Sequence, residues 1–175
     1  MRAEPLIESR SVAIDAEGAE LTGRFTPAIG VTRAGLVIHG ATGVPQRYYA
    51  AFAEWAASQG IASLTYDYRD FESSLKRPLS ESKATFSDWI VRDQPAAERA
   101  LAKLVGNAPL WVLGHSAGGL GIMFHKHDPR IERITTVGSG HAFVADHPWS
   151  YLPMVLAFWY AAGPVGTTIA GYLPG

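Results

Sequence analysis

The chain has 175 residues, of which 47% are hydrophobic and 18% are charged, and its formal net charge at pH 7 is −1. This length allows one domain with a sizeable core, and the balanced charge gives no indication of a nucleic-acid partner. The absence of cysteine excludes disulfides, thiolate metal sites and a cysteine nucleophile. Because residues 1–11 contain no apolar signal-peptide core, we expect a soluble, cytoplasmic protein.

The first part of the chain predicts a β-hairpin followed by a strand, a helix and a second strand. Residues 11–25 alternate apolar and polar side chains around a glycine turn, which is typical of a hairpin. Residues 35–39 form a short apolar run, as in strands buried on both faces of a parallel sheet. Residues 46–60 predict a helix, and the next strand ends near Asp67. The apolar stripe expected to face the core is Tyr48, Phe52, Trp55 and Ala56.

Strands and helices continue to alternate in the second part. Residues 71–87 are rich in Ser, Lys and Pro and predict a polar loop. Residues 93–105 predict a helix with Pro95 near its start and with Leu101, Leu104 and Val105 turned inward. A buried strand at 109–114, a helix at 117–127 and a fourth parallel strand at 133–140 follow. This alternation predicts an α/β fold with a mostly parallel sheet.

Residues 148–175 differ from the rest because they contain no charged side chain. A transmembrane helix needs about 20 apolar residues, and this run is interrupted by Pro153, Gly163, Pro164 and Gly166. We therefore expect no transmembrane span, but a buried or lid-like helical hairpin. Exposed apolar patches of this size usually mark interfaces, so self-association through residues 148–175 is the partner contact we expect.

Residues 114–118, Gly-His-Ser-Ala-Gly, match the G-x-S-x-G pattern of a nucleophile elbow. Small residues two positions before and after the serine let a strand and a helix approach each other, so that the hydroxyl of Ser116 projects beyond the sheet. The helix N-terminus stabilises negative charge, and the backbone N–H of Ala117 can donate to an oxyanion. The alternative is a plain glycine turn with a solvent-facing serine.

A second glycine-rich turn, residues 39–43, follows an earlier strand and precedes a helix. A loop in this position supplies the second oxyanion donor to a nucleophile elbow, and the backbone N–H of Ala41 is the candidate. We expect His39 to orient this loop through hydrogen bonds. No Gly-Lys-Ser/Thr follows, so the turn is not a phosphate-binding loop; a βα turn without a ligand is the alternative.

With both turns in place, residues 11–140 resemble the α/β-hydrolase superfamily, in particular its esterases, lysophospholipases and serine-aminopeptidase-like hydrolases. The resemblance implies an N-terminal hairpin, a mostly parallel sheet, flanking helices and a partial helical lid. It divides the chain into a hydrolase core at 1–147 and the start of a lid or interface segment at 148–175. It implies a serine hydrolase without a cofactor, acting on a small-molecule ester, thioester or amide with an apolar acyl part through an acyl-enzyme at Ser116.

The resemblance leaves the other two members of a catalytic triad unassigned. In the superfamily the acid and the histidine follow the serine along the chain, usually after the lid, and this sequence is expected to end within the lid. His141 and Asp146 follow the fourth parallel strand and are substitute candidates, because the carboxyl ends of parallel strands share one edge. Alternatively, His141 lies in the substrate cleft. A second hypothesis is therefore a catalytically incomplete module that needs further residues or a second chain.

Three other stretches carry weaker interpretations. His125 and His127 are two residues apart, so on the predicted helix they face different ways. We expect no metal site there, but a helix C-terminus whose dipole suits cationic side chains. The charged residues 67–74 are interpreted as a solvated rim. Residues 138–143 lack the third glycine of a dinucleotide fingerprint, so no nucleotide cofactor is expected.

Overall fold

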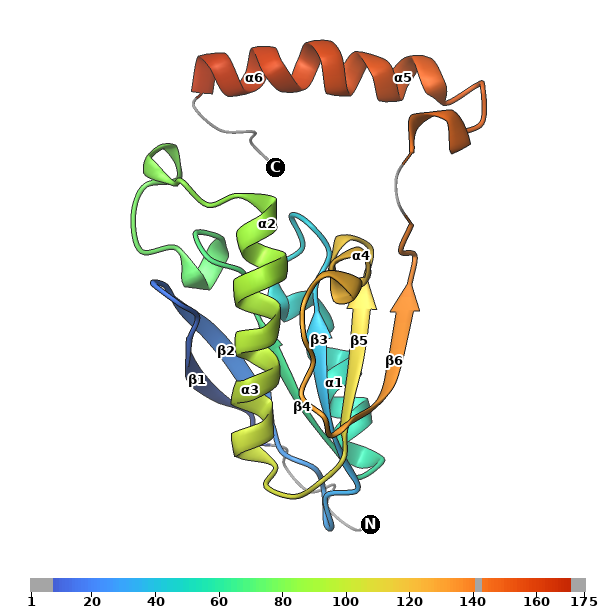
Figure 1. Cartoon of the computed structure of the whole chain (residues 1–175). Helices are drawn as coiled ribbons and strands as arrows, with labels where there is room; N and C mark the ends of the chain where they lie inside the picture. Colours follow the sequence, from blue (N-terminus) through green and yellow to red (C-terminus); the bar gives the residue numbers. More distant parts are fainter. Residues whose placement is uncertain (1–7, 141–142, 171–175) are drawn as a thin grey trace, which may run out of the picture.

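The structure is a computed structural model that describes residues 8–140 and 143–170. Six strands form one sheet in the order β1-β2-β4-β3-β5-β6 (Figure 1). The strands are β1 (Arg10–Asp15), β2 (Glu20–Thr26), β3 (Ala34–His39), β4 (Ile61–Tyr66), β5 (Leu110–His115) and β6 (Ile131–Val137). Strands β1, β2 and β4 pair antiparallel, whereas β4, β3, β5 and β6 pair parallel. The predicted hairpin and the mostly parallel sheet are confirmed.

Helices cover both faces of this sheet, with α1 (Ala50–Ser58) on one face and α3 (Gln94–Leu104) on the other (Figure 1). All six residues of β3 are buried, which explains the continuous apolar run in its sequence. Alternate side chains of β3 enter two core clusters: Val37 belongs to the larger one with Leu101 of α3, and Ile38 to the smaller one with Tyr49.

The helix predicted over residues 46–60 is present as a short helical turn, Gln46–Tyr49, followed by α1. Its predicted inward face is wrong at the aromatic positions, because Tyr48 is 68% exposed, Phe52 38% and Trp55 56%. The residues buried against the sheet are Tyr49, Ala53, Ala56 and Ala57. Alanine allows α1 to pack close to β4, and the larger rings remain on the outer side of the helix.

The long helix on the other face is built from three segments. It begins at α2 (Phe86–Asp88), continues through a π-turn at Trp89–Asp93 and ends with α3. Thr85 caps the start, since its side chain accepts from the N–H of Asp88 at 3.2 Å. The predicted inward position of Leu101 is confirmed, and Pro95 lies in the first turn of α3. Residues 71–85 form the loop before this helix, with two short helical turns at Glu72–Ser74 and Leu79–Glu81.

The helix predicted over residues 117–127 is shorter than expected. α4 (Ala117–Gly121) passes into one helical turn, Ile122–Phe124, and the backbone at His125 is extended, with φ −138° and ψ 165°. Three of the five residues of α4 are glycine, and glycine costs about 1 kcal/mol per residue relative to alanine in a helix. The expected placement of His125 and His127 in the last turn of a helix is therefore wrong.

The expected helical hairpin in the apolar tail is also wrong, because the tail forms one continuous helix. It consists of α5 (Leu152–Ala157), a π-turn at Phe158–Ala162 and α6 (Gly163–Ala170). The N–H of Gly163 donates to the carbonyl of Phe158 five residues back, so the widened turn accommodates Pro164 without a break.

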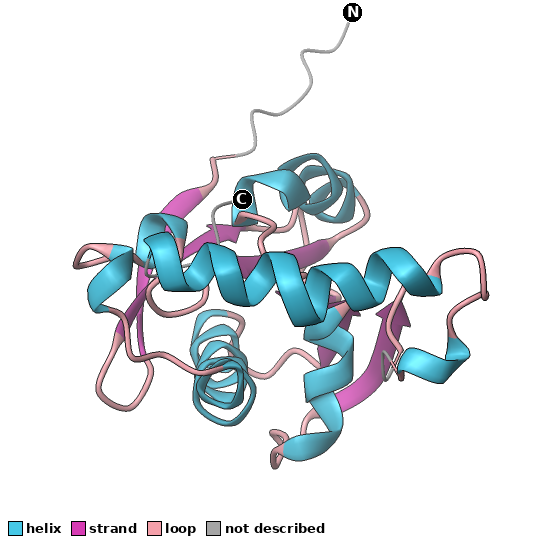
Figure 2. Cartoon of the chain, turned by 90° about the horizontal axis from the view of Figure 1, so that it is seen from above, coloured by secondary structure: helices cyan, strands magenta, loops and turns pink. Residues whose placement is uncertain are grey.

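This tail helix lies over the end of the sheet to which the parallel strands point (Figures 1 and 2). None of its residues from Leu152 to Ile169 is buried, and by length and composition alone the helix could cross a membrane.

Candidate active site

Ser116 occupies a strained turn between β5 and α4. Its φ is +53° and its ψ is −117°, a backbone conformation that L-residues rarely adopt and that costs about 1–3 kcal/mol. Hydrogen bonds hold the turn: Ser116 N–H donates to the carbonyl of Val137 at 2.9 Å, and its carbonyl accepts from Gly119 N–H at 3.0 Å. The turn therefore has the geometry of a nucleophile elbow.

The glycines around Ser116 are required by close packing. A Cβ atom on Gly114 would collide with the backbone of Gly119, and one on Gly118 would collide with the carbonyl of His39. A Cβ atom on Gly119 would collide with the side chain of Ser139. Small residues at these positions therefore do allow the strand and the helix to approach closely, as the G-x-S-x-G spacing predicts. The contact of Gly118 with His39 also brings the elbow against the 39–43 turn.

The two candidate oxyanion donors, Ala41 and Ala117, lie on these adjoining segments. Ala117 is the first residue of α4, so its N–H has no acceptor within the helix. The N–H of Ala41 donates to the hydroxyl of Tyr49 at 2.9 Å, and this hydroxyl lies 3.0 Å from Nδ1 of His115. Burial raises the pKa of Tyr49, so the phenol is neutral and can donate its proton to His115.

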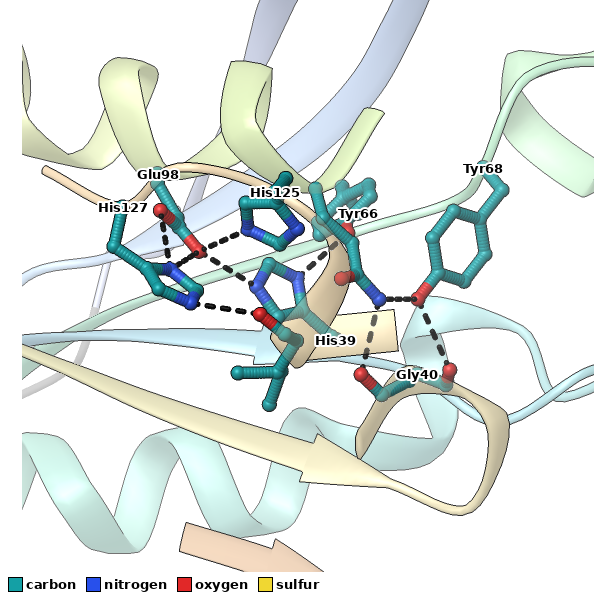
Figure 3. Close-up of polar contacts among 10 residues, drawn as sticks. His39, Gly40, Tyr66, Tyr68, Glu98, His125 and His127 are labelled. Carbon is teal, nitrogen blue, oxygen red and sulfur yellow. Dashed lines mark hydrogen bonds and ion pairs between the residues drawn. The ribbon is translucent and has the colours of Figure 1, made fainter. Parts of the chain in front are cut away.

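A buried amide and a buried phenol join the two turns, and Figure 3 shows the bond between Tyr68 and Gly40. The hydroxyl of Tyr68 donates to the carbonyl of Gly40 at 3.2 Å. Nε2 of Gln94 donates to the carbonyl of Gly118 at 3.0 Å and to the Tyr68 hydroxyl at 3.4 Å. Sequence reasoning missed both residues, because a tyrosine after a strand and a glutamine in a helix carry no local motif.

His39 is the last residue of β3 and the first of the 39–43 turn, and it is fully buried. Its Nδ1 is 2.7 Å from the hydroxyl of Tyr66, and its Nε2 is 3.3 Å from Oε1 of Glu98 (Figure 3). Burial lowers the pKa of His39, outweighing the opposite effect of Glu98. The residue is thus a neutral imidazole that anchors the end of β3 through hydrogen bonds.

The structure does not bring the candidate base and acid, His141 and Asp146, into a described contact with Ser116. Within the described residues, no side-chain hydrogen bond is present at Oγ of Ser116. His141 lies outside the described residues. Asp146 ends a short helical turn, Val144–Asp146, that leads from β6 towards α5. The structure therefore brings the elbow and the 39–43 turn together, and among the described residues no base is hydrogen-bonded to Oγ of Ser116.

The interpretation of residues 67–74 as a solvated rim is wrong for its first three positions and for Ser74. Asp67, Tyr68 and Arg69 are buried. Asp67 accepts from the N–H of Gln46 at 2.7 Å, and Nη2 of Arg69 lies 2.7 Å from Oδ1 of Asp93. These charged residues can be buried because Asp67 accepts hydrogen bonds and Arg69 forms an ion pair. The composition of the segment does not show such partners.

A mostly parallel sheet with a strained serine at a strand–helix turn defines the α/β-hydrolase fold. The chain is similar to a highly thermostable carboxyl esterase from Bacillus coagulans (TM-score 0.63, 11% identity, covering 90% of this chain and 52% of that one). It is also similar to the hypothetical protein PA2218 from Pseudomonas aeruginosa (TM-score 0.65, 14% identity, 98% and 57% covered). A third similar structure is the alpha/beta hydrolase GrgF from Penicillium sp. sh18 (TM-score 0.59, 18% identity, 91% and 55% covered).

These likenesses confirm the predicted fold. The chain spans little more than half the length of these three structures. No protein-family model and no curated protein matches it by sequence.

Proposed function

We propose that this chain is a serine hydrolase acting on a small-molecule ester, thioester or amide with an apolar acyl part. The observation that carries the proposal is the positive φ of Ser116, +53°, at the junction of β5 and α4. Glycine would adopt this conformation without strain, whereas a serine is retained at a cost in stability. Strain of this kind is typical of a residue whose side chain is required in one exposed position.

The chemistry follows from the groups around Ser116. Its Oγ attacks the carbonyl carbon and loses its proton to a base, and the carbonyl oxygen becomes an oxyanion that accepts from the N–H groups of Ala41 and Ala117. Collapse of this intermediate expels the alcohol, thiol or amine and leaves the acyl-enzyme, which water then hydrolyses. In this chain His141 is the candidate base and Asp146 the candidate acid.

Labelling with an organophosphonate probe tests this role. We expect the probe to modify Ser116 alone among the serines, and to do so slowly, because Ser116 Oγ has no base bonded to it among the described residues. Peptide mass spectrometry identifies the modified residue, and Ser116→Ala is the control. Modification of other serines at the same rate, or none at Ser116, would reject the proposal.

A second candidate function is a module that a second chain completes. The observation that favours it is the edge strand β6, in which every residue after the first, Ile131, is exposed. An uncovered strand edge can pair with another strand. If a second copy supplies the base, the rate constant for labelling Ser116 rises with protein concentration, whereas a self-sufficient chain shows a constant value.

A further inference from the structure

A buried carboxylate on α3 faces three imidazole rings (Figure 3). Oε1 of Glu98 lies 3.0 Å from Nε2 of His125, 3.0 Å from Nδ1 of His127 and 3.3 Å from Nε2 of His39. One ligand atom from each of Glu98, His125 and His127 lies within 4.8 Å of the others. The extended backbone after Phe124 explains this arrangement, because residues two apart in an extended chain project to the same side.

The hydrogen bonds of His127 fix which of its nitrogens carries hydrogen. Nε2 is 2.8 Å from the carbonyl oxygen of Ile122, which only accepts, so Nε2 is the donor. In a neutral ring the Nδ1 lone pair then faces both oxygens of Glu98, at 3.0 and 3.2 Å. Two lone pairs repel each other unless a positive charge lies between them, either a proton or a metal ion. Metal-binding histidines characteristically donate their other N–H to a carbonyl in this way.

The negative charge of Glu98 also requires a positive charge beside it. Its side chain is 1% exposed, and its ion-pair partners among the described residues are all histidines, with no lysine or arginine. A buried carboxylate needs a compensating cation. His39 approaches Glu98 from the interior, where the Tyr66 hydroxyl at 2.7 Å holds the ring, so His39 orients the carboxylate from behind.

We propose that Glu98, His125 and His127 bind one divalent transition-metal ion, with Zn²⁺ as the best-matched ion. Two imidazoles and a carboxylate suit Zn²⁺ and its neighbours, whereas Mg²⁺ and Ca²⁺ prefer ligand sets made of oxygen. Bonds of 2.0–2.1 Å in a tetrahedron separate ligand atoms by about 3.3 Å. The separations of 3.0 Å from Glu98 therefore need to widen by only a few tenths of an ångström.

An ion can reach this site from solvent. The side chain of His127 is 23% exposed and borders a groove of about 450 Å³, which Met123 and Ile134 also line. Water in this groove supplies the fourth ligand. The bound ion joins α3 to the segment that follows the elbow, and through His39 it supports the 39–43 turn. The role of the ion is therefore to stabilise the elbow. A test of ion binding does not depend on Ser116 being a nucleophile.

The experiment measures Zn²⁺ and Co²⁺ binding to the full, tag-free chain after chelator treatment and dialysis. We expect one Zn²⁺ per chain by calorimetry, a rise in the unfolding temperature with Zn²⁺, and visible d–d absorption with Co²⁺ from nitrogen and oxygen ligands. Glu98→Gln and His127→Gln should each weaken Zn²⁺ binding at least 10- to 100-fold, the loss typical of removing even an outer-shell partner. His147→Gln, outside the cluster, is the matched control and should bind like the wild type.

Two outcomes overturn the proposal. One is the absence of stoichiometric binding by the wild-type chain, in which case a proton on His127 supplies the positive charge. The other is binding that Glu98→Gln and His127→Gln leave unchanged. Because Glu98 is buried, its variant could fail to fold; His127→Gln is partly exposed, and its amide can still donate to Ile122, so it keeps the test decisive.

Discussion

The hydroxyl of Tyr49 accepts the hydrogen bond of the Ala41 N–H at 2.9 Å, so the candidate oxyanion donor already has an acceptor in the free chain. The same hydroxyl lies 3.0 Å from Nδ1 of His115. The Tyr49 hydroxyl thus lies between the Ala41 N–H and the His115 ring. A substrate oxyanion must therefore replace the Tyr49 hydroxyl at Ala41.

Tyr49→Phe should free the Ala41 N–H for the oxyanion and raise the rate of phosphonylation at Ser116. A hydrogen bond has a net worth of about 0.5–1.5 kcal/mol, which corresponds to a rate increase of about two- to tenfold. Labelling kinetics measure this increase. Tyr48→Phe, on a ring that is 68% exposed, is the control. A lower rate in Tyr49→Phe would mean that the hydroxyl itself donates to the oxyanion.

Ser116→Gly should increase the free energy of unfolding by about 1 kcal/mol, because glycine adopts the φ of +53° without strain. Ser116→Ala removes the hydroxyl but retains the strain, so its stability should stay close to that of the wild type. Urea denaturation of the three proteins provides the comparison. Equal stabilities of the glycine and alanine variants would show that the elbow stores no strain.

Gln94 and Tyr68 should hold the two turns of the site as a coupled pair. Gln94→Leu removes the bond to the Gly118 carbonyl and leaves that carbonyl without its donor, at a cost of about 1–3 kcal/mol. Tyr68→Phe removes the bond to the Gly40 carbonyl. The double variant should lose less than the sum of the two single losses, which chemical denaturation measures. Gln59→Leu, at an exposed position, is the control.

The sequence predicted the strands well because each is a short apolar run with glycine or polar residues at its ends. It also predicted the tight turn at Ser116, since the elbow is a local motif whose glycines have a steric reason. The inward face of α1 was wrong because hydrophobic periodicity ranks tryptophan above alanine, whereas close packing on the sheet selects alanine. Helix periodicity separated His125 from His127, and only the early end of the helix, at Phe124, brings both to Glu98.

The polar residues beneath the site were missed for a different reason. Glu98 and His39 are far apart in the sequence, and their contact arises only when α3 packs across β3. Arg69 and Asp93 are a second such pair. A segment rich in charged residues indicates solvent exposure. Its side chains are buried favourably only when the fold supplies partners of opposite charge from elsewhere in the sequence. Sequence patterns therefore located the elbow turn and not the polar network beneath it.

Arg69→Met should destabilise the chain by about 3–5 kcal/mol, because it leaves the buried carboxylate of Asp93 without its ion-pair partner. Arg69→Met combined with Asp93→Leu should recover part of this loss, since both charges are then removed. The exposed pair of Arg47 and Glu72, 2.8 Å apart, is the matched comparison, and Arg47→Met should have little effect. Thermal unfolding compares these three variants with the wild type. Equal effects at the two arginines would contradict the interior role of Arg69.

The tail helix, residues 152–169, should cause the full chain to self-associate, because it carries no charge and none of its residues is buried. Trp159 is 63% exposed and Ile169 is 82% exposed. A second copy of the helix would cover such apolar surface and gain about 25 cal/mol for each square ångström removed from water. Light scattering coupled to size exclusion should therefore show an oligomer whose mass increases with concentration. Trp159→Glu with Ile169→Glu should give a monomer, whereas Met123→Glu, at an exposed position on the core, should not. A monomer at every concentration would contradict self-association, and flotation of that monomer with lipid vesicles would instead identify a membrane as the surface that the helix covers.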